Sequence, residues 1–230
     1  RAAELACLRR AAADARASGG GAIAVLGPSG IGKTELVRRF LDELEAGPEA
    51  LVLRGRCEPQ EIVPFNAFDG LIDGLSTWLT GQPTEGLAEE IGAAGVDALA
   101  RVFPVLGRCA AFARSDAATT AEPYEIRRRA FAATRTLLSA VARDRELVVW
   151  IDDAQWADAD SAALLGELLR TPRTPAMLLV VSARSGHGDE VSGEGPLVEA
   201  LTAAGVERLE VGPLDPAAAG ELARRLWLAS

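Results

Sequence analysis

The fold is decided by residues 22–34, which read Ala22-Ile23-Ala24-Val25-Leu26-Gly27-Pro28-Ser29-Gly30-Ile31-Gly32-Lys33-Thr34. The first five of these are a short apolar run, the pattern of a parallel strand that is buried on both faces. The next eight fit the phosphate-loop pattern G-x-x-x-x-G-K-[ST] in full. Behind them, residues 33–44 carry their apolar side chains on one helical stripe. Strand, glycine loop and helix follow in the order that this motif requires, so the sequence predicts a phosphate-binding loop.

The glycines of this loop are expected to present backbone amides to a phosphate group. Gly27, Gly30 and Gly32 allow the backbone to turn back on itself, so that successive N–H groups converge on one anion. The amino end of the following helix adds a partial positive charge at the same point. The residues that we expect to hold a nucleotide are Gly27, Pro28, Ser29, Gly30, Ile31, Gly32, Lys33, Thr34 and Glu35.

Lys33 is the only lysine among the 24 basic residues of the chain. The excess of arginine looks like a coding bias that replaces lysine wherever either residue serves, so a retained lysine indicates a specific requirement. A lysine is a long, mobile point charge that bridges the outer phosphates, which the rigid fork of an arginine does not imitate. We therefore expect Lys33 to be both nucleotide-binding and catalytic, and Thr34 to ligate Mg²⁺.

Two carboxylates follow another apolar strand. Residues 147–151 read Leu-Val-Val-Trp-Ile, and Asp152 and Asp153 come directly after them. Because the carboxyl ends of parallel strands meet at the edge where the phosphate loop lies, we expect both acids in the same crevice. Asp152 is the candidate metal residue beside Thr34, and Asp153 is the candidate catalytic residue that orients or deprotonates the attacking water.

Strands and helices alternate along the rest of the chain. This order predicts an α/β fold of three layers, α/β/α, around a five-stranded parallel sheet. The remaining strands are expected at residues 50–54, 146–151, 176–182 and 207–211. Helices are expected at residues 2–17, 123–143, 161–170, 196–203 and 215–229, with several more between residues 64 and 114.

Composition excludes several classes of protein. The chain has 230 residues and a formal net charge of −9, with 49% hydrophobic and 25% charged residues, which is an ordinary globular balance. Its three cysteines lie far apart, so neither a disulfide framework nor a zinc site is indicated. An acidic domain does not attract phosphate backbones, and the apolar runs are too short to span a bilayer. We therefore expect a cytoplasmic domain that binds neither nucleic acid nor membrane directly.

With both motifs in place, the chain resembles the STAND branch (signal-transduction ATPases with numerous domains) of the ASCE/AAA-like P-loop ATPases. The segment 151–158, Ile-Asp-Asp-Ala-Gln-Trp-Ala-Asp, is similar to the extended Walker B motif of that branch. Gly55-Arg56-Cys57 followed by Val63-Pro64-Phe65 resembles its second-strand exit, and Arg1 resembles the remnant of an N-terminal Gly-Arg-Glu motif near the adenine. The strand that ends at Arg184 is similar to the sensor-1 strand, which implies a catalytic role for Arg184 in sensing the γ-phosphate.

The resemblance also implies a fold and a function. The strand order is expected to be 5-1-4-3-2, and residues 1–230 to form one P-loop ATPase domain with a helical insertion at about 64–122. The implied ligands are ATP or ADP with Mg²⁺, hydrolysed slowly because Asp153 is shorter than the glutamate of many fast ATPases. The implied role is a signalling switch in large bacterial regulators that carry a kinase or a LuxR-type DNA-binding domain. Sensor and output domains of the same polypeptide and nucleotide-dependent self-association are the expected partners.

From the resemblance we expect residues 1–230 to lack the C-terminal lid that usually completes the nucleotide pocket of that branch. Affinity and hydrolysis are therefore expected to be lower than in a longer parent polypeptide, because water is not excluded from the γ-phosphate.

Three other functions are alternatives to this one. A GTPase that reads guanine with Asn-Lys-x-Asp is excluded, because Asn66 is the only asparagine and has no lysine nearby. A P-loop small-molecule kinase and a nucleotide-binding scaffold without significant hydrolysis remain open. Two positions also stay open: Trp156 either packs beside the nucleotide or anchors its loop in the core, and Arg127–Arg129 supply either an arginine finger or, as we expect, a solvated helix face.

Overall fold

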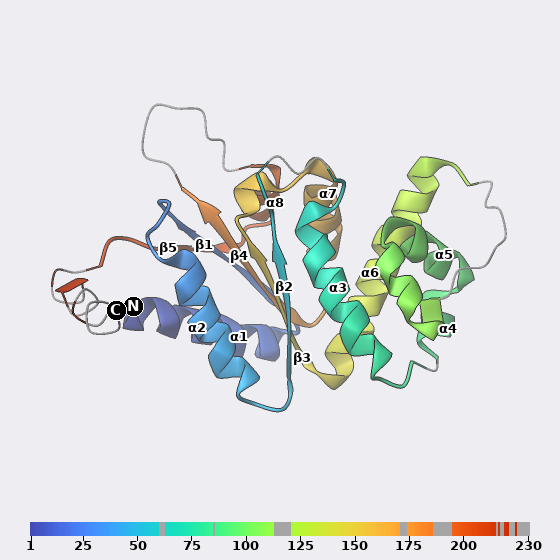
Figure 1. Ribbon diagram of the computed structural model, residues 1–230, viewed down its shortest axis with the longest axis horizontal. Coiled ribbons are helices and arrows are strands. Elements are labelled where there is room, and N and C mark those ends of the chain that lie inside the picture. Colours follow the sequence, from blue (N-terminus) through green and yellow to red (C-terminus); the bar gives the residue numbers. More distant parts are fainter. Residues whose placement is uncertain are drawn as a thin grey trace.

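The computed structural model describes residues 1–59, 63–84, 86–112, 121–170, 174–185 and 195–214, together with residues 216, 219–220 and 224. Strands alternate with helices along these parts of the chain (Figure 1). The strands are β1 (Gly21–Gly27), β2 (Ala50–Arg56), β3 (Glu146–Asp152), β4 (Met177–Arg184) and β5 (Glu207–Glu210). The α-helices are α1 (Ala2–Ser18), α2 (Lys33–Glu45), α3 (Asn66–Thr80), α4 (Leu87–Ile91), α5 (Ala93–Val102), α6 (Pro123–Asp144), α7 (Ala159–Leu168) and α8 (Pro196–Ala203). Short 3₁₀ turns occur at η1 (Pro104–Arg108), η2 (Ala110–Phe112) and η3 (Ala154–Trp156).

The five strands form one sheet in the order β2-β3-β4-β1-β5, and every neighbouring pair is parallel. The predicted order 5-1-4-3-2 is the same order counted from the other edge, so the predicted fold is confirmed. Since all five strands run in one direction, their carboxyl ends lie at a single edge of the sheet. The phosphate loop follows β1 at that edge, and the acidic pair lies at the end of β3.

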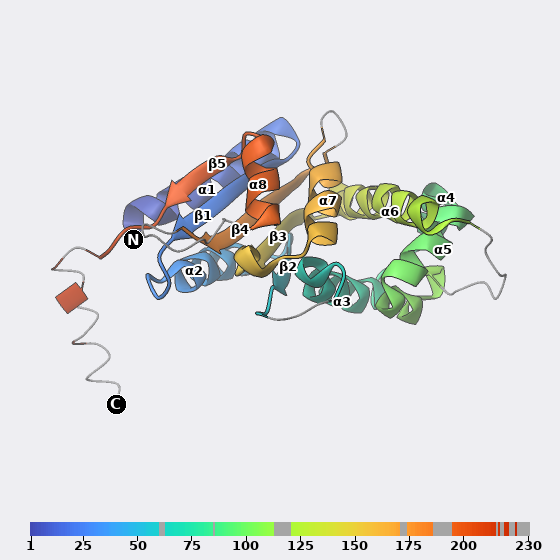
Figure 2. The same cartoon turned by 90° about the horizontal axis from the view of Figure 1, so that it is seen from above.

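The two faces of the sheet are covered by different helices (Figure 2). Alternate residues of a strand point to opposite faces. Val148 and Trp150 of β3 therefore lie in one hydrophobic cluster with α1 and α2. Val149 and Ile151 lie in the other cluster, with α3, α6, α7 and α8. The sheet is buried between these two layers, which explains the nearly continuous apolar runs of its central strands.

The described residues between β2 and β3 are mostly helical, as the sequence predicts. Figures 1 and 2 place α4 and α5 beyond the end of the sheet, beside α6. Arg143, near the end of α6, forms an ion pair with Glu90 of α4 at 2.6 Å. Phe65 begins this region, with ring centroids 5.6 Å from Phe103 and 5.8 Å from Phe131, both in edge-to-face geometry. Its φ of 66° is left-handed, a backbone conformation that is strained for an aromatic residue and that this packing holds in place.

Several predicted boundaries differ from the observed ones by one or two residues, and two of them have a clear physical reason. β2 continues to Arg56 and not only to residue 54, because Gly55 and Arg56 still pair with Ile151 and Asp152 of β3. A glycine and an exposed arginine carry no hydrophobic alternation, so the sequence pattern ended too early. α7 begins at Ala159 and not at Ser161, because Asp158 caps it. The helix expected at 215–229 lies almost entirely outside the described residues.

Among the parts of the chain that the structure describes, every helix is too short or too polar to cross a lipid bilayer.

The fold makes a prediction about its core. Phe40 of α2 is fully buried against the sheet, whereas Tyr124 of α6 is 77% exposed. Replacing Phe40→Ala leaves a cavity in a layer that cannot close around it, so we expect the free energy of unfolding to fall by about 3–5 kcal/mol. Tyr124→Ala serves as the aromatic control, with an expected change within about 0.5 kcal/mol. Urea unfolding followed by circular dichroism measures both; equal losses would contradict the assignment of Phe40 to the core.

Candidate functional site

The loop between β1 and α2 has the backbone conformation that its sequence predicts. Gly30 and Gly32 have φ angles of 74° and 97°, in the left-handed region that other residues rarely adopt. Pro28, Ser29 and Gly30 are exposed, so this side of the loop is open to a ligand. α2 begins at Lys33, directly behind Gly32, and its first-turn N–H groups have no partners within the helix.

The Lys33 side chain folds back over this loop. Its Nζ donates hydrogen bonds to the backbone oxygens of Gly27 at 2.8 Å and Pro28 at 3.0 Å, and the residue is only 8% exposed. Burial lowers the pKa of the Lys33 ammonium group below its usual value; Asp153 and Asp152 oppose this shift, while the positive charge of Arg184 adds to it. The ammonium group is thus already positioned at the loop. Its present acceptors are backbone carbonyls, and the oxygens of a bound anion would take their place.

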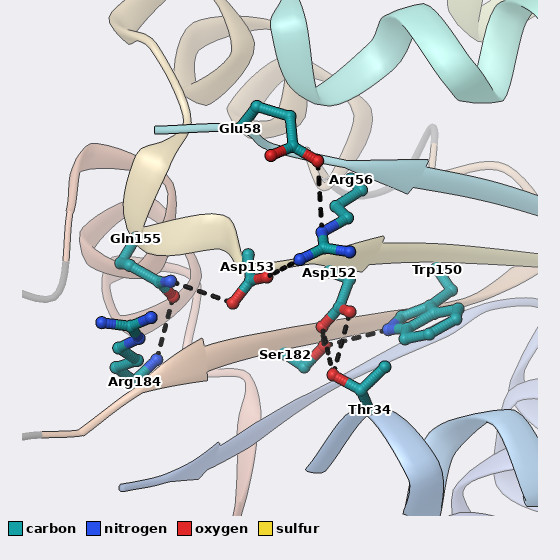
Figure 3. A network of polar contacts seen from close by, with 9 residues as sticks. All are labelled: Thr34, Arg56, Glu58, Trp150, Asp152, Asp153, Gln155, Ser182 and Arg184. Carbon is teal, nitrogen blue, oxygen red and sulfur yellow. Dashed lines mark hydrogen bonds and ion pairs between the residues drawn. The ribbon is translucent and has the colours of Figure 1, made fainter. Parts of the chain in front are cut away.

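Asp152 and Thr34 meet across the crevice, although they are 118 residues apart in the sequence. Thr34 Oγ1, at the start of α2, donates to Asp152 Oδ2 at 3.0 Å and also lies 3.3 Å from Oδ1 (Figure 3). Asp152 ends β3 and is 4% exposed. A hydroxyl and a carboxylate are the oxygen ligands that Mg²⁺ takes from proteins, usually one or two at a time beside water and phosphate oxygens. The donor set therefore fits Mg²⁺, as the sequence predicts for these two residues.

Ser182 contacts Asp152 directly and Trp150 contacts Ser182, although the sequence motifs identify neither as a site residue. Ser182 Oγ on β4 donates to Asp152 Oδ1 at 2.5 Å, and Trp150 Nε1 donates to Ser182 Oγ at 3.0 Å. The one feature of the sequence that could have indicated Ser182 is its polarity, because it follows the apolar run of β4 that ends at Val181. For Trp150, nothing in the apolar pattern of β3 distinguishes it from a core residue.

Asp153 is held by two side chains. Its Oδ2 lies 3.2 Å from Nη2 of Arg56, and its Oδ1 accepts a hydrogen bond from Gln155 Nε2 at 3.1 Å (Figure 3). Its φ of 54° is left-handed, which an aspartate adopts more readily than most residues. The register of β2 against β3 places Arg56 opposite Asp152 and so beside Asp153. In the sequence, Arg56 belongs only to the segment that resembles the second-strand exit, and its ionic contact with Asp153 depends on the strand register.

Arg184 lies at the same edge of the sheet, but its guanidinium group turns toward Trp156. The backbone N–H of Arg184 donates to Gln155 Oε1 at 3.0 Å, so Gln155 connects Asp153 with the end of β4. The guanidinium carbon lies 5.9 Å from the centroid of the Trp156 ring. Trp156 is 41% exposed, which places its indole at the rim of the site and not in the core.

Two other residues of the N-terminal region border the loop. Arg1 Nη2 donates to the backbone oxygen of Ile31 at 2.7 Å, and its Nη1 donates to Glu4 at 2.8 Å. Arg1 therefore ties the start of α1 to the phosphate loop. Glu35, which the sequence analysis included among the nucleotide-binding residues, lies exposed in the first turn of α2.

Arg127–Arg129 lie on α6 and are bound to acids of the same chain. Arg127 forms an ion pair with Asp160 at 2.6 Å, and Arg128 and Arg129 both contact Glu125. This arrangement agrees with the expected helix face.

Asp158 caps two helices at once. Its Oδ1 accepts from the backbone N–H groups of Asp160 at 2.8 Å and Ser161 at 2.9 Å, which caps α7. Its Oδ2 accepts from the backbone N–H of Asn66 at 2.9 Å, in the first turn of α3, and from Ser161 Oγ at 2.6 Å. Asn66 Nδ2 in turn donates to the backbone oxygen of Trp156 at 3.1 Å. The helical region is therefore joined to the loop that follows the acidic pair.

Burial acts to raise the pKa of Asp158, but hydrogen bonds from Ser161 and from the backbone of Phe65 and Asn66 outweigh it, so the pKa lies below the usual aspartate value. A depressed folded-state pKa means that this stabilisation is present above the unfolded-state pKa. It is lost as the pH falls through the folded-state pKa.

Comparison with known families gives one match across most of the chain. A family model described as AAA ATPase domain matches residues 1–181, which include the phosphate loop and the acidic pair. An uncharacterized protein of Rhizobium meliloti (strain 1021) is 29% identical over 208 residues, which make up 85% of this chain and 18% of that protein. The chain thus spans about a fifth of the length of this curated relative.

Two matches among solved structures are at low sequence identity. A Signal Transduction ATPase with Numerous Domains (STAND) protein with a tetratricopeptide repeat sensor from Pyrococcus horikoshii matches 98% of this chain and 25% of its own, with 17% identity and a TM-score of 0.47. A Drosophila ORC structure with GC-rich DNA and Cdc6 matches 94% of this chain and 61% of that chain, with 13% identity and a TM-score of 0.39.

The double cap predicts a loss of stability on substitution. Asp158→Ala removes the cap of α3 and the cap of α7, each worth about 1 kcal/mol, so we expect the free energy of unfolding to fall by about 2 kcal/mol at neutral pH. Asp14 of α1, whose side chain is 71% exposed, supplies the control Asp14→Ala, with no measurable change expected. Urea unfolding at several pH values measures both. The difference between wild type and Asp158→Ala should shrink in acid, and a constant difference would argue against the carboxylate caps.

Proposed function

This chain belongs to the AAA ATPase domain family, and on that premise we propose that it binds ATP or ADP with Mg²⁺ and hydrolyses ATP slowly. The observation that carries the proposal is the meeting of three groups at one edge of the sheet. A buried ammonium on Lys33 lies in the phosphate loop, and Thr34 touches Asp152 beside it. Positive charge for phosphates and oxygen ligands for a divalent cation are thus placed together.

The phosphate loop supplies the binding of the polyphosphate. The N–H groups at the start of α2 and the glycine-rich turn face the anion, and the Lys33 ammonium group exchanges its bonds to the Gly27 and Pro28 carbonyls for bonds to phosphate oxygens. Little backbone rearrangement is needed, because Gly30 and Gly32 already hold the turned conformation.

Thr34 and Asp152 would hold the metal, Thr34 through its hydroxyl and Asp152 through its carboxylate. Mg²⁺ supplies, when bound, a concentrated positive charge that stabilises the charge developing on the transferred phosphoryl group. The hydroxyl of Thr34 is kept in place by its bond to Asp152.

Asp153 is the residue that we assign to orient or deprotonate the attacking water. Its carboxylate is already shared between Arg56 and Gln155. Both carboxylate oxygens of Asp153 already have partners, and the short side chain reaches less far than a glutamate. Both features support slow hydrolysis.

Arg184 remains our candidate for contact with the γ-phosphate. In that role the guanidinium group leaves Trp156 and turns toward the loop, where its positive charge already influences Lys33. The Gln155 amide is hydrogen-bonded both to the backbone N–H of Arg184 and to the carboxylate of Asp153, so it connects the two residues.

Within the family we assign the chain to the STAND branch, as a regulatory switch of bacterial signalling proteins. The extended Walker B segment 151–158 supports this assignment. We further propose that residues 1–230 form one ATPase domain with a helical insertion at about 64–122. Its proposed setting is the cytoplasm, with sensor and output domains of the same polypeptide, including output in transcription regulation, and self-association that depends on nucleotide.

Nucleotide binding is tested by Lys33→Ala. Losing two charge-assisted bonds to phosphate, each worth about 1.5–3 kcal/mol, is expected to weaken ADP binding by about 10²-fold or more. Arg38→Ala, an exposed residue of the same helix, is the control and should bind like wild type. Isothermal titration calorimetry with ADP and Mg²⁺ measures both. Binding by Lys33→Ala that matches Arg38→Ala would remove the basis of the proposal.

Hydrolysis is tested at Asp153. We expect slow, Mg²⁺-dependent release of phosphate from the wild-type protein, about 10²-fold less from Asp153→Asn, and more from Asp153→Glu, whose carboxylate reaches further. Asp14→Asn is the matched control on an exposed helix. A rate that Asp153→Asn leaves unchanged would favour the scaffold without hydrolysis. Phosphate transfer to an added small-molecule acceptor would favour a kinase, and rapid turnover like that of motor ATPases would refute slow hydrolysis.

A further inference from the structure

Two buried side chains lie behind Asp152 and form a chain of hydrogen bonds that ends on its carboxylate. Trp150 Nε1 is 3.0 Å from Ser182 Oγ, and Ser182 Oγ is 2.5 Å from Asp152 Oδ1 (Figure 3). Trp150 and Asp152 are each 4% exposed, and Ser182 is fully buried. The hydrogen bonds given for these two side chains lie within this group, Trp150 to Ser182 and Ser182 to Asp152.

The chemistry of the three groups fixes the direction of both hydrogen bonds, from Trp150 to Ser182 and from Ser182 to Asp152. An indole N–H is a donor only, so Ser182 Oγ must accept from Trp150. A serine hydroxyl has one hydrogen to donate and two lone pairs that accept. Because the Trp150 N–H occupies a lone pair, the Ser182 hydrogen remains free to be donated to Asp152 Oδ1. A donor that is itself hydrogen-bonded is polarised and donates more strongly, and a bond to a carboxylate is stronger still.

The strand register brings the three residues together. β3 and β4 are parallel neighbours, with Trp150 opposite Val180 and Ile151 opposite Val181. Residues two apart on a strand share a face, so Asp152 lies on the same face as Trp150, and Ser182 on the same face as Val180. That face is the one covered by α2, from which Thr34 approaches.

The contact with Thr34 alone does not fix the carboxylate. The single hydroxyl hydrogen of Thr34 lies between two oxygens, at 3.0 Å from Oδ2 and 3.3 Å from Oδ1. Ser182 contacts Oδ1 alone and at a shorter distance, so it is the bond that distinguishes the two oxygens of Asp152. The rotation of the carboxylate is therefore set from β4.

We propose that Ser182 and Trp150 are positioning residues for Asp152 and that, through it, they set the affinity of this site for Mg²⁺. The inference rests on the proposed function, because it concerns the metal that accompanies the nucleotide. Ser182 holds the carboxylate that faces the metal position, and Trp150 holds the Ser182 hydroxyl in the donating orientation. Groups in this relation to a metal ligand typically contribute 10–100-fold to metal affinity.

The experiment compares two variants with matched controls. Ser182→Ala removes the hydroxyl, and Trp150→Phe removes the indole N–H while keeping a large aromatic ring. Ser76→Ala is the control for the first, because Ser76 is also buried but donates to the backbone of Val105 in the helical region. Trp78→Phe, in α3, is the control for the second.

Titrations with Mg²⁺ at fixed ADP give the Mg²⁺ concentration at half-maximal enhancement of ADP binding, and titrations with ADP in EDTA give the metal-free affinity. We expect the Mg²⁺ midpoint to rise about tenfold or more in Ser182→Ala and by less in Trp150→Phe, with the metal-free affinity for ADP within about twofold of wild type. The double variant should be no worse than Ser182→Ala, because Trp150 acts only through that hydroxyl. The two controls should keep the wild-type midpoint.

A spectroscopic readout separates positioning from general packing and needs no hydrolysis. The indole ¹H–¹⁵N signal of Trp150, identified by its loss in Trp150→Phe, should shift when Mg²⁺ is added to the ADP-bound wild-type protein, with the same midpoint as the binding curve. The signal of Trp78 should stay in place. In Ser182→Thr, which keeps a hydroxyl, both the shift and the low Mg²⁺ midpoint should return.

The possible failures are distinguishable. Wild-type protein that takes up no ADP, with or without Mg²⁺, overturns the proposed function and this inference with it. Wild-type protein with Mg²⁺-dependent binding, but with Ser182→Ala and Trp150→Phe behaving like Ser76→Ala and Trp78→Phe, overturns this inference alone. Losses that add in the double variant, or that appear equally without Mg²⁺, also overturn it.

Discussion

The site depends on one property of the parallel sheet, which is that the carboxyl ends of all its strands lie at the same edge. Gly27, Arg56, Asp152 and Arg184 end β1, β2, β3 and β4. Polar side chains are costly inside a sheet that is covered on both faces, so they collect where the strands leave it. The contact between Thr34 and Asp152 follows from this property, since it joins the loop after β1 to the end of β3.

Charges at this edge are already balanced by one another. Lys33 is buried on backbone carbonyls with two carboxylates nearby, and Asp153 is paired with Arg56. Such a site is preorganised for an anion and a divalent cation, because their partners are already oriented. Both oxygens of Asp153, the residue that we propose to act on water, are occupied by Arg56 and Gln155. The slow turnover that we propose for this site suits a switch better than a motor.

The helical region is connected to this edge through Asp158 and Asn66. One carboxylate caps both α3 and α7, and the Asn66 amide holds the backbone of Trp156. The two non-glycine residues with left-handed φ among the described residues, Phe65 and Asp153, flank this junction. The loop that follows the acidic pair is therefore hydrogen-bonded to the start of α3, although the two segments are far apart in the sequence.

The sequence by itself determined the strand, loop and helix around Lys33, the five-stranded sheet and the roles expected of Thr34 and Asp152, because local motifs and hydrophobic period are properties of neighbouring residues. Only the tertiary structure decided that Ser182 and Trp150 stand behind Asp152, that Arg56 pairs with Asp153, and that Arg184 turns toward Trp156. These contacts join different strands, and strand register is set by the packing of the whole sheet. The hydrophobic pattern of a strand shows which of its residues face each layer, but it does not name the residue of the neighbouring strand that lies beside each of them.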